Sequence, residues 1–370
     1  MGIPPLSDEI KKQTIAALEE AGGNAAAAAR AMGIPERTFR DRVKRSIPAS
    51  YIPEGQKLKG TSTLYDMEGN ERLTWVKTTA DLDRQLEIIK EAAEAFKGSI
   101  GKETPSKAKP QCQSDLASVY VLTDYHLGQL SWADETGADW NIELAEDLLV
   151  NWFKRAIEAA PASHTGVLAQ LGDFLHYDSL EALTPTSKHV LDADSRYALM
   201  VRVAIRALRR IISMMLEKHE RVHIIMAYGN HDLTSSVWLR EMLFDKYSNE
   251  PRVTVDNSAT PFYVFEHGLT SLFFHHGHKR KLNELSQTFA ALYRDIFGRT
   301  KYSYAHMGHL HHIASKEDGL MLVEQHPTLA AKDAHSAFGG YVSNRGACVI
   351  TYSAKHGEVS RVTIRPEMVL

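Results

Sequence analysis

The spacing of apolar and polar positions changes twice along the chain and divides it into three segments. In the first segment, from Ser7 to Arg45, apolar side chains recur at helical intervals in three short stretches. Asn24 can cap the second of these stretches, and Pro35 fits the first turn of the third, where a missing N–H costs little. The pattern predicts three short helices arranged as a helix-turn-helix, with a tight turn at Gly33.

The second segment combines a strand pattern with a helix pattern. Between Leu58 and Thr78, apolar and polar residues alternate on both sides of the turn sequence MEGNE, which predicts a β-hairpin. From Asp81 to Phe96, apolar residues recur at helical spacing and predict an amphipathic helix that packs or dimerises. We therefore expect a helix-turn-helix domain at 1–47, a linker with hairpin and helix at 48–115, and a larger domain at 116–370.

The third segment alternates between strand and helix patterns, which is typical of an α/β domain. The first strand patterns are SVYVLTDYH, TGVLAQLGDF and RVHIIMAYGN, and helical patterns lie between them. Further strand patterns are RVTVDN, FYVFEHG, TSLFFHHG and ACVITYSA, with the helical stretch NELSQTFAALYRDIF among them. We expect these later strands to form a second sheet that closes against the first.

The bulk composition indicates where in the cell the protein resides but says little about its chemistry. Hydrophobic residues make up 44% and charged residues 24%, as in an ordinary globular protein with a sizeable core. Cys112 and Cys348 follow no metal-ligand spacing and make a poor disulfide framework. The N-terminus lacks a secretory pattern, and no window approaches the apolar length of a membrane span. We expect a cytoplasmic protein without membrane insertion.

Acidic residues and histidines gather where the predicted strands of the third segment end. Asp124 and His126 follow the first of these strands, and Gly172 and Asp173 follow the second. Side chains at a strand end can reach one ion, and two divalent cations about 3.5–4 Å apart need a shared carboxylate to lower their repulsion. Asp173 is the candidate bridging ligand.

The next strand ends supply further ligand types. Asn230 follows the third strand and offers a neutral oxygen, which leaves the adjacent His231 for acid chemistry. Three more histidines are candidate nitrogen ligands, namely His276, His309 and His311. Imidazole suits manganese, iron, zinc or nickel, so the donor set points to a transition metal.

The motifs DxH, GD, GNHD, HG and GHxH follow one another from Asp124 to His312, and in this order they resemble the signature of the calcineurin-like metallophosphoesterases. Each motif is common by itself, whereas five in this order after predicted strands are specific. The resemblance implies a two-sheet α/β/β/α sandwich, a catalytic domain at 116–370 and two divalent metal ions. Mn²⁺ is the favoured metal, with Fe²⁺, Zn²⁺ and Ni²⁺ as alternatives, and phosphoester hydrolysis would use a metal-bridging hydroxide.

The resemblance also implies a role for each residue. One ion would be held by Asp124, His126, Asp173 and His311, and the other by Asp173, Asn230, His276 and His309. His231 would stabilise or protonate the leaving oxygen, and Asp232 would orient it through its other ring nitrogen. The alternative for Asp232 is to cap the following helix.

One departure from the common pattern bears on the substrate. Many phosphatases of this class have GDxxD, whereas this chain has GDFLH, which puts His176 three residues after Asp173. The departure resembles the DNA-repair exonuclease branch, in which this histidine supports positioning and protonation near the metals. The alternative is that His176 only hydrogen-bonds to residues around the site.

The N-terminal string GGNAAAAARAMGIPERTFRDRVKR resembles the Fis-type helix-turn-helix, with Met32 where that family often has leucine. Its last helix carries five basic side chains against one acid and can meet the phosphates and base edges of DNA. These side chains are Arg37, Arg40, Arg42, Lys44 and Arg45. The alternative is a unit that mediates dimerisation or protein contact.

A DNA nuclease is the function that these features favour, because a DNA-binding module would deliver a phosphodiesterase site to polymeric phosphate. The segment after GDFLHYDS supplies candidate substrate contacts, with Lys188 and Arg196 foremost beside His189, Asp192 and Asp194, and the alternative for this segment is a solvated loop. Two alternatives stay open: a phosphatase or phosphodiesterase of small nucleotides, and a catalytically idle DNA-binding regulator. The order of modules also resembles proteins of phages and prophages, which would place the protein in a host cytoplasm. A homodimer is the expected assembly.

Overall fold

The computed structural model describes residues 7–21, 25–46, 56–65, 71–80, 110–185 and 188–369. The chain divides into two compact units, Met1–Ala93 and Glu94–Leu370, and each is described by itself. The cap predicted at Asn24 and the amphipathic helix predicted from Asp81 to Phe96 lie outside the described residues.

Three short helices form the described start of the first unit: α1 (Asp8–Glu20), α2 (Ala25–Ala31) and α3 (Glu36–Ser46). Ala28, Ala29 and Phe39 are buried together and give this unit its small core. Gly33 has a φ of 64°, a left-handed conformation that glycine adopts without steric cost, and it turns the chain between α2 and α3. The predicted helix-turn-helix is confirmed.

The same unit contains the strands β1 (Gln56–Tyr65) and β2 (Glu71–Ala80), which pair antiparallel. They cover the stretch in which the alternation of apolar and polar residues predicts a hairpin. The register shifts between Leu58 and Gly60, as it does where a β-bulge inserts an extra residue into one strand.

The larger sheet of the second unit has six strands in the order β13-β12-β3-β4-β5-β6. The neighbours β3, β4, β5 and β6 are parallel, whereas β12 is antiparallel to both β3 and β13. The strands are β3 (Gln113–Leu122), β4 (Ser163–Gln170), β5 (Arg221–Met226), β6 (Val253–Val255), β12 (Ala347–Ser353) and β13 (Gly357–Ile364). Parallel neighbours require crossover connections, which the intervening helices provide.

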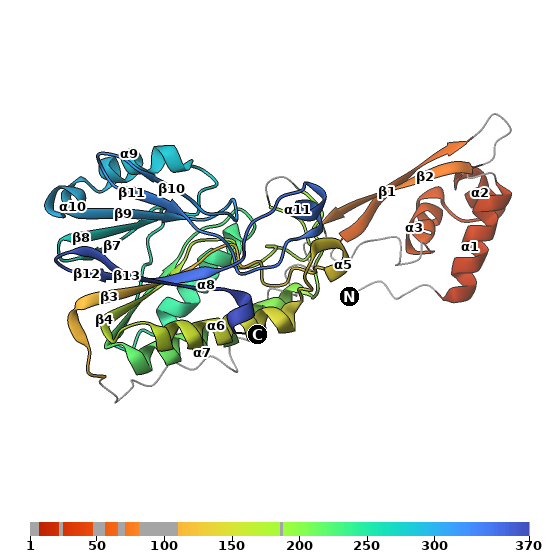
Figure 1. Ribbon diagram of the computed structural model, residues 1–370. Coiled ribbons are helices and arrows are strands. Elements are labelled where there is room, and N and C mark those ends of the chain that lie inside the picture. Colours follow the sequence, from red (N-terminus) through yellow and green to blue (C-terminus); the bar gives the residue numbers. More distant parts are fainter. Residues whose placement is uncertain are drawn as a thin grey trace. The chain divides into compact units, whose positions relative to one another are not determined.

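Two long helices, α6 (Ile142–Ala159) and α7 (Tyr197–Lys218), cover the outer face of this sheet (Figure 1). The side chain of Asn141 caps α6 by accepting the backbone N–H of Leu144 at 2.8 Å. The apolar faces of both helices pack in one cluster with Tyr120 and Leu122, which alternation places on the same face of β3. Helix α8 (Leu233–Lys246) lies at β5 and β6.

The smaller sheet has five strands in the order β10-β11-β9-β8-β7. They are β7 (Tyr263–His267), β8 (Thr270–Phe274), β9 (Tyr302–Met307), β10 (Ala314–Glu317) and β11 (Leu322–Gln325). Strand β9 is parallel to both of its neighbours, β8 and β11. Helices α9 (Leu282–Leu292) and α10 (Arg294–Arg299) cover its outer face, where Phe273, Phe289 and Phe297 pack together (Figure 1).

The two sheets share an apolar interior. Val119 and Val121, which alternate along β3 with the residues that face α6, pack here with Leu272 and Phe274 of β8. The layers are therefore helices, six-stranded sheet, five-stranded sheet and helices. The predicted α/β/β/α sandwich is confirmed. The expected membership of the second sheet is corrected at two strands: β6 in RVTVDN and β12 in ACVITYSA belong to the six-stranded sheet, where β6 pairs with β5 and β12 with β3.

The sequence pattern missed the short or polar elements. Strand β10 has the sequence ASKE, in which no apolar period is present, and β13 is an edge strand with a run of exposed residues at its centre. Also missed were α5 (Ala133–Thr136), α11 (Ala334–Phe338) and the 3₁₀ turn η2 (Pro366–Met368). None of the described helices is long and apolar enough to cross a membrane.

Candidate metal centre

The carboxyl ends of five strands meet at one edge of the two sheets and bring the predicted ligands together. Asp124, Asp173 and Asn230 follow the neighbouring parallel strands β3, β4 and β5, while His276, His309 and His311 follow the parallel strands β8 and β9. Backbone hydrogen bonds connect these loops, for example from Asp124 N–H to the Gly172 carbonyl and from Gly308 N–H to the His276 carbonyl. The topology explains why residues so distant in sequence converge.

Most of the predicted ligands have a backbone conformation that L-amino acids rarely adopt. Six non-glycine residues in the described part of the chain have a positive φ, and five of these six are predicted ligands. The five are Asp124 (50°), His126 (48°), Asp173 (52°), His309 (77°) and His311 (56°). Such conformations cost about 1–3 kcal/mol each and persist only where the surrounding structure imposes them. Their concentration at one sheet edge indicates a functional site.

One group of donor atoms is formed by Asp124, His126 and His311, whose donors lie within 4.8 Å of one another. Oδ1 of Asp124 is 3.1 Å from Nε2 of His311, and the Nε2 atoms of His126 and His311 are 3.3 Å apart. Oδ2 of Asp124 accepts the His309 N–H and the Thr123 hydroxyl. Oδ1 is buried without a hydrogen-bond partner among the described residues, so it is available to a cation.

A second group of donor atoms is formed by Asp173, His276 and His309. Nε2 of His276 lies 3.2 Å from Oδ2 of Asp173 and 3.1 Å from Oδ1 of Asn230. Nδ1 of His276 lies 2.9 Å from the carbonyl oxygen of Leu171 and donates to it. That hydrogen bond fixes the tautomer and leaves the lone pair of Nε2 for the site.

Asp173 belongs to both groups electrostatically. Its Oδ1 accepts the backbone N–H of His231 at 2.8 Å, and its charge acts on both His126 and His276. Burial lowers the pKa of His276, but the carboxylates of Asp173 and Asp124 outweigh burial and raise that pKa to about 9. Without a metal, the carboxylates thus hold a buried proton where a divalent cation would neutralise them. The carboxylate, amide and imidazole donors fit such a cation.

Two glycines allow the close approach of these loops. A Cβ at Gly308 would lie 1.8 Å from Oγ1 of Thr123 and 2.5 Å from Oδ2 of Asp124. A Cβ at Gly229 would lie 2.0 Å from Oδ1 of Asp173. The glycines of the GNHD and GHxH motifs are therefore needed because a side chain would occupy the space of the carboxylates.

Asp232 has a different role from the predicted one. Nδ1 of His231 lies 2.8 Å from the carbonyl oxygen of His176 and donates to it. The buried carboxylate of Asp232 instead accepts the backbone N–H groups of Phe174 and Leu175 at 2.8 and 3.1 Å. It anchors the loop after β4, so the predicted pairing of Asp232 with the ring of His231 is corrected. Asp232 does occupy the N-cap position of α8, although its side chain makes no cap hydrogen bond there. The turn after β5 directs the two adjacent side chains to different partners.

His176 lies between a predicted ligand and His231. Its Nδ1 is 3.4 Å from Nδ1 of His126, and its ring stacks 5.7 Å from the ring of His231. Burial lowers the pKa of His176 to about 3, so the ring is neutral. Because the carbonyl of His176 also holds His231, the residue positions both neighbours.

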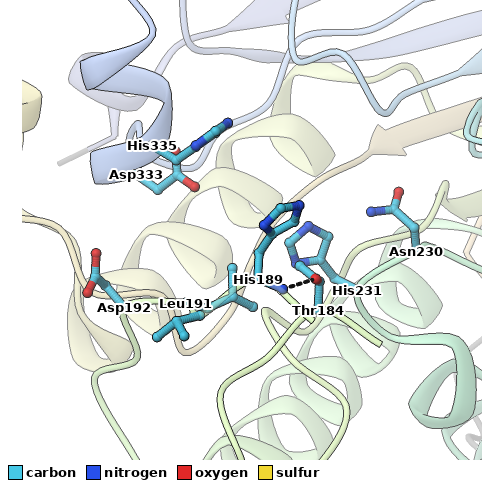
Figure 2. A pocket seen from close by; sticks show the side chains of 9 residues that line it. Thr184, His189, Leu191, Asp192, Asn230, His231, Asp333 and His335 are labelled. Carbon is cyan, nitrogen blue, oxygen red and sulfur yellow. Dashed lines mark hydrogen bonds between the residues drawn. The ribbon is translucent and has the colours of Figure 1, made fainter. Parts of the chain in front are cut away.

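We call the sheet edge that holds Asp124, Asp173, His276 and the other predicted ligands the metal edge. A cavity of about 370 Å³ lies beside it (Figure 2). It is lined by Thr184, His189, Val190, Leu191, Asp192, Asn230, His231, Asp333 and His335. Figure 2 shows His231 next to His189, with Asp192 and Asp333 on the side away from Asn230. Asp333 belongs to the cavity although its Oδ1 also caps α11, by accepting the N–H of Ser336.

Among the predicted substrate contacts, His189 and Asp192 line this cavity, whereas Lys188 and Arg196 do not. Lys188 is an exposed loop residue with a φ of 58°. Arg196 is the N-cap residue of α7, where its backbone carbonyl accepts the N–H of Leu199. The predicted loop therefore reaches the cavity through His189 and Asp192, while Asp194 accepts the N–H of Ile142 at 2.7 Å.

The sequence reasoning missed a group that follows His276. The ring of His278 lies 5.2 Å from the ring of His276 and 6.3 Å from that of His309. Lys279 and Arg280 follow directly and are exposed. The signal was present in the string HHGHKRK, where a third histidine and three cations follow the ligand motif.

The predicted DNA-contacting residues lie on α3. Arg37 and Arg40 are exposed and Arg42 is half-buried, while the side chains of Lys44 and Arg45 lie outside the described part. Arg40 pairs with Glu36 one turn earlier at 2.7 Å, and such exposed pairs are weak.

A further histidine group, His306, Glu324 and His326, satisfies itself within the protein. Nδ1 of His306 is 2.9 Å from Nε2 of His326, and Nε2 of His306 is 3.0 Å from the hydroxyl of Tyr352. Burial lowers the pKa of both histidines to about 3, which makes them a neutral hydrogen-bonded pair. Glu324 is paired with Arg361 at 2.7 Å.

A family model described as "Bacterial regulatory protein, Fis family" matches residues 11–45, the helix-turn-helix segment. A comparison with curated proteins gives no match. Solved structures that are similar include a conserved Streptococcus pneumoniae TIGR4 protein described as a predicted phosphoesterase, with 12% identity and a TM-score of 0.29 over 67% of this chain and 98% of that one.

Two other similar structures are Vps29 complexed with Zn²⁺ from Entamoeba histolytica and an archaeal phosphodiesterase. Their identities are 14% and 16%, with TM-scores of 0.30 and 0.33. Each match covers 67% of this chain and 99% of the other.

Proposed function

We propose that residues 116–370 form a metal-dependent phosphodiesterase of the calcineurin-like class. The observation that carries this proposal is the set of five predicted ligands held in left-handed backbone conformations at one sheet edge. Two donor groups meet there, and Asp173 faces both of them. Backbone strain of this kind is retained at functional sites, where it fixes the direction of each side chain.

The residues of the two groups have complementary tasks in this proposal. Two divalent cations, when bound, would supply an activated water and neutralise charge on the phosphate oxygens. Asp124, His126 and His311 would hold one cation, Asn230, His276 and His309 the other, and Asp173 both. Because hydrogen bonds already fix the donor atoms, little reorganisation is needed when the phosphate arrives. Mn²⁺ is the metal we favour, with Fe²⁺, Zn²⁺ and Ni²⁺ as alternatives.

His231 is the candidate acid in this proposal. Its Nδ1–H is committed to the carbonyl of His176, so its Nε2 is the atom that can stabilise or protonate a leaving oxygen. The residue is half-buried and lines the cavity, where a leaving group can reach it (Figure 2). His176 is the positioning residue that keeps this ring in place.

DNA is the substrate that the N-terminal domain favours. Residues 1–47 carry the Fis-type match, and the exposed guanidinium groups of α3 can contact phosphates. We retain 48–115 as the linker between this domain and the catalytic domain. The homodimer stays a prediction, since the helix on which it rests, at 81–96, lies outside the described residues.

A small nucleotide is the second candidate substrate, and the cavity favours it. A volume of about 370 Å³ suits a small ligand. Asp192 and Asp333 would accept hydrogen bonds from a base or sugar, whereas they would repel a polyphosphate backbone. An open DNA groove would not need two carboxylates beside the acid His231.

Turnover of chromogenic esters tests the proposal. Purified protein with Mn²⁺ is offered bis-p-nitrophenyl phosphate and p-nitrophenyl phosphate, followed by labelled DNA and cyclic nucleotides. Hydrolysis of the diester, with little hydrolysis of the monoester, is the expected result. If no ester is hydrolysed with Mn²⁺, Fe²⁺, Zn²⁺ or Ni²⁺ while DNA is still bound, the enzyme proposal fails and an idle DNA-binding regulator takes its place.

A further inference from the structure

The segment from His276 to α9 leads from a metal ligand to a group of cations. Gly277 has a φ of 116° and turns the chain against Gly308 and His309, so that His278 lies near two ligand rings. Nδ1 of His278 is buried and has no hydrogen-bond partner among the described residues. Because successive Cα atoms are about 3.8 Å apart, Lys279 begins at most about 11 Å from the ligand His276.

Two cations lie close to the start of α9 in the sequence. Lys279 and Arg280 precede Lys281, the N-cap residue of α9, whose 11 residues begin at Leu282. The N-terminal end of a helix carries positive partial charge and disfavours cations there. Both side chains are exposed, and within the described part of the chain neither has an ion pair or hydrogen bond. Glu284 in the first turn of α9 offsets the positive helix end, because its carboxylate accepts the N–H of Lys281 at 3.1 Å. The attraction for anions at this position therefore comes from the two exposed cations.

The cavity at His231 carries the opposite charge. The cavity next to His231 is lined by the carboxylates of Asp192 and Asp333 (Figure 2). A second phosphate of a substrate would be repelled there and attracted at Lys279 and Arg280. The charges thus give the substrate a direction across the site.

We propose that Lys279 and Arg280, together with the ring of His278, form a subsite for a phosphate group adjacent to the scissile one. This inference rests on the proposed phosphodiesterase activity and narrows its substrates to molecules with at least two phosphates. Such a neighbouring phosphate belongs to a DNA strand or to a nucleoside polyphosphate. The organic group between or beyond the phosphates lies in the cavity at His231.

A pair of chromogenic diesters that differ by one phosphate tests the subsite. They are thymidine 5′-p-nitrophenyl phosphate and its 3′-phosphorylated form, both given to the full chain with Mn²⁺. The wild type should prefer the 3′-phosphorylated ester, and Lys279→Ala/Arg280→Ala should lower that preference in kcat/KM about tenfold, the loss of one charge-assisted hydrogen bond. Lys279→Arg/Arg280→Lys, which keeps both charges, should restore most of the preference.

The matched control is Lys154→Ala/Arg155→Ala, which removes an exposed Lys-Arg pair from α6. It should keep the wild-type preference, because α6 covers the outer face of the larger sheet. A preference that survives Lys279→Ala/Arg280→Ala would overturn the subsite, and equal use of the two esters by the wild type would exclude a DNA strand as its occupant.

Calorimetry keeps the test independent of turnover. Binding of thymidine 5′-monophosphate, 5′-diphosphate and 3′,5′-bisphosphate is compared in Mn²⁺-loaded wild type and Lys279→Ala/Arg280→Ala. Tighter binding of the bisphosphate points to DNA, and tighter binding of the diphosphate points to a polyphosphate. In either case the gain over the monophosphate should disappear in the variant. If the variant loses that gain although no diester is hydrolysed, the subsite stands and the phosphodiesterase proposal fails. If the wild type shows no gain, or if the variant keeps it, the subsite is overturned.

Discussion

The metal edge of the second unit and helix α3 of the first are both rich in charge, yet they hold their side chains in opposite ways. At the metal edge the carboxylates of Asp124 and Asp173 are buried, each with one oxygen fixed by a backbone N–H. On α3, Arg37 and Arg40 project from a regular helix into solvent. The edge needs one geometry, whereas the helix needs only a charge of the right sign. Substitutions should therefore cause large losses of turnover at the metal edge and small losses of DNA affinity on α3.

The largest effect is expected for Asp173→Ala. It removes a carboxylate whose charge acts on both donor groups, so both cations and at least about 10³-fold in turnover should be lost, as expected when a metal site is dismantled. Metal content and hydrolysis of bis-p-nitrophenyl phosphate are the measurements. Asp134→Ala, at an exposed position of α5, is the control and should keep both. Full metal content in Asp173→Ala would contradict the claim that metal binding at this edge depends on Asp173.

Gly308→Ala should have the next largest effect. The new Cβ would lie 1.8 Å from Oγ1 of Thr123, and Thr123 donates to the carboxylate of Asp124. We expect turnover to fall on the order of 10²-fold, because a ligand displaced by about 1 Å disturbs the positioning of the reaction. Gly319→Ala, where nothing lies within 4 Å of the added Cβ, should behave as the wild type. Equal rates for the two variants would contradict the tight geometry of the edge.

A buried histidine away from the metal edge, His219, allows the pH dependence of fold stability to be tested without changing the site. Burial lowers the pKa of His219 to about 4 from 6.5, so between these values the unfolded chain binds the extra proton. Stability is unaffected by this group above pH 6.5 and falls as the pH drops from 6.5 to 4, by about 3 kcal/mol in all. In urea unfolding, the free energy of unfolding should fall less between pH 7 and pH 4.5 in His219→Gln than in the wild type. The exposed His356→Gln should retain the full loss, and equal losses in both variants would disprove the account.

The smallest effect is expected on α3. Arg37→Ala/Arg40→Ala should weaken DNA binding about tenfold and reduce the salt slope by about 2, as for phosphate contacts. Hydrolysis of bis-p-nitrophenyl phosphate should stay at the wild-type rate. Lys12→Ala, an exposed lysine of α1, serves as control and should leave the salt slope at its wild-type value. A large loss of diester turnover in the arginine variant would show that α3 acts on the chemistry.

The layers could be predicted from sequence because alternation divides strands such as β3 into an α6 face and an interior face, as Tyr120 and Val121 show. The convergence of the predicted ligands followed from parallel strands ending at one edge. Hydrogen-bond partners could not be predicted in the same way. Asp232 and His231 are adjacent in sequence, but the turn directs them to different backbone groups. The cavity also depends on α11, whose five residues carry no helical pattern of their own.

The most direct test of the metal edge is anomalous diffraction from crystals grown with Mn²⁺. The account predicts two peaks at this edge, one on each side of Asp173, separated by about 3.5–4 Å as in two-metal sites. One peak should lie among Asp124, His126 and His311, and the other among Asn230, His276 and His309. A single peak, or none at this edge at saturating Mn²⁺, would contradict the proposed dinuclear centre.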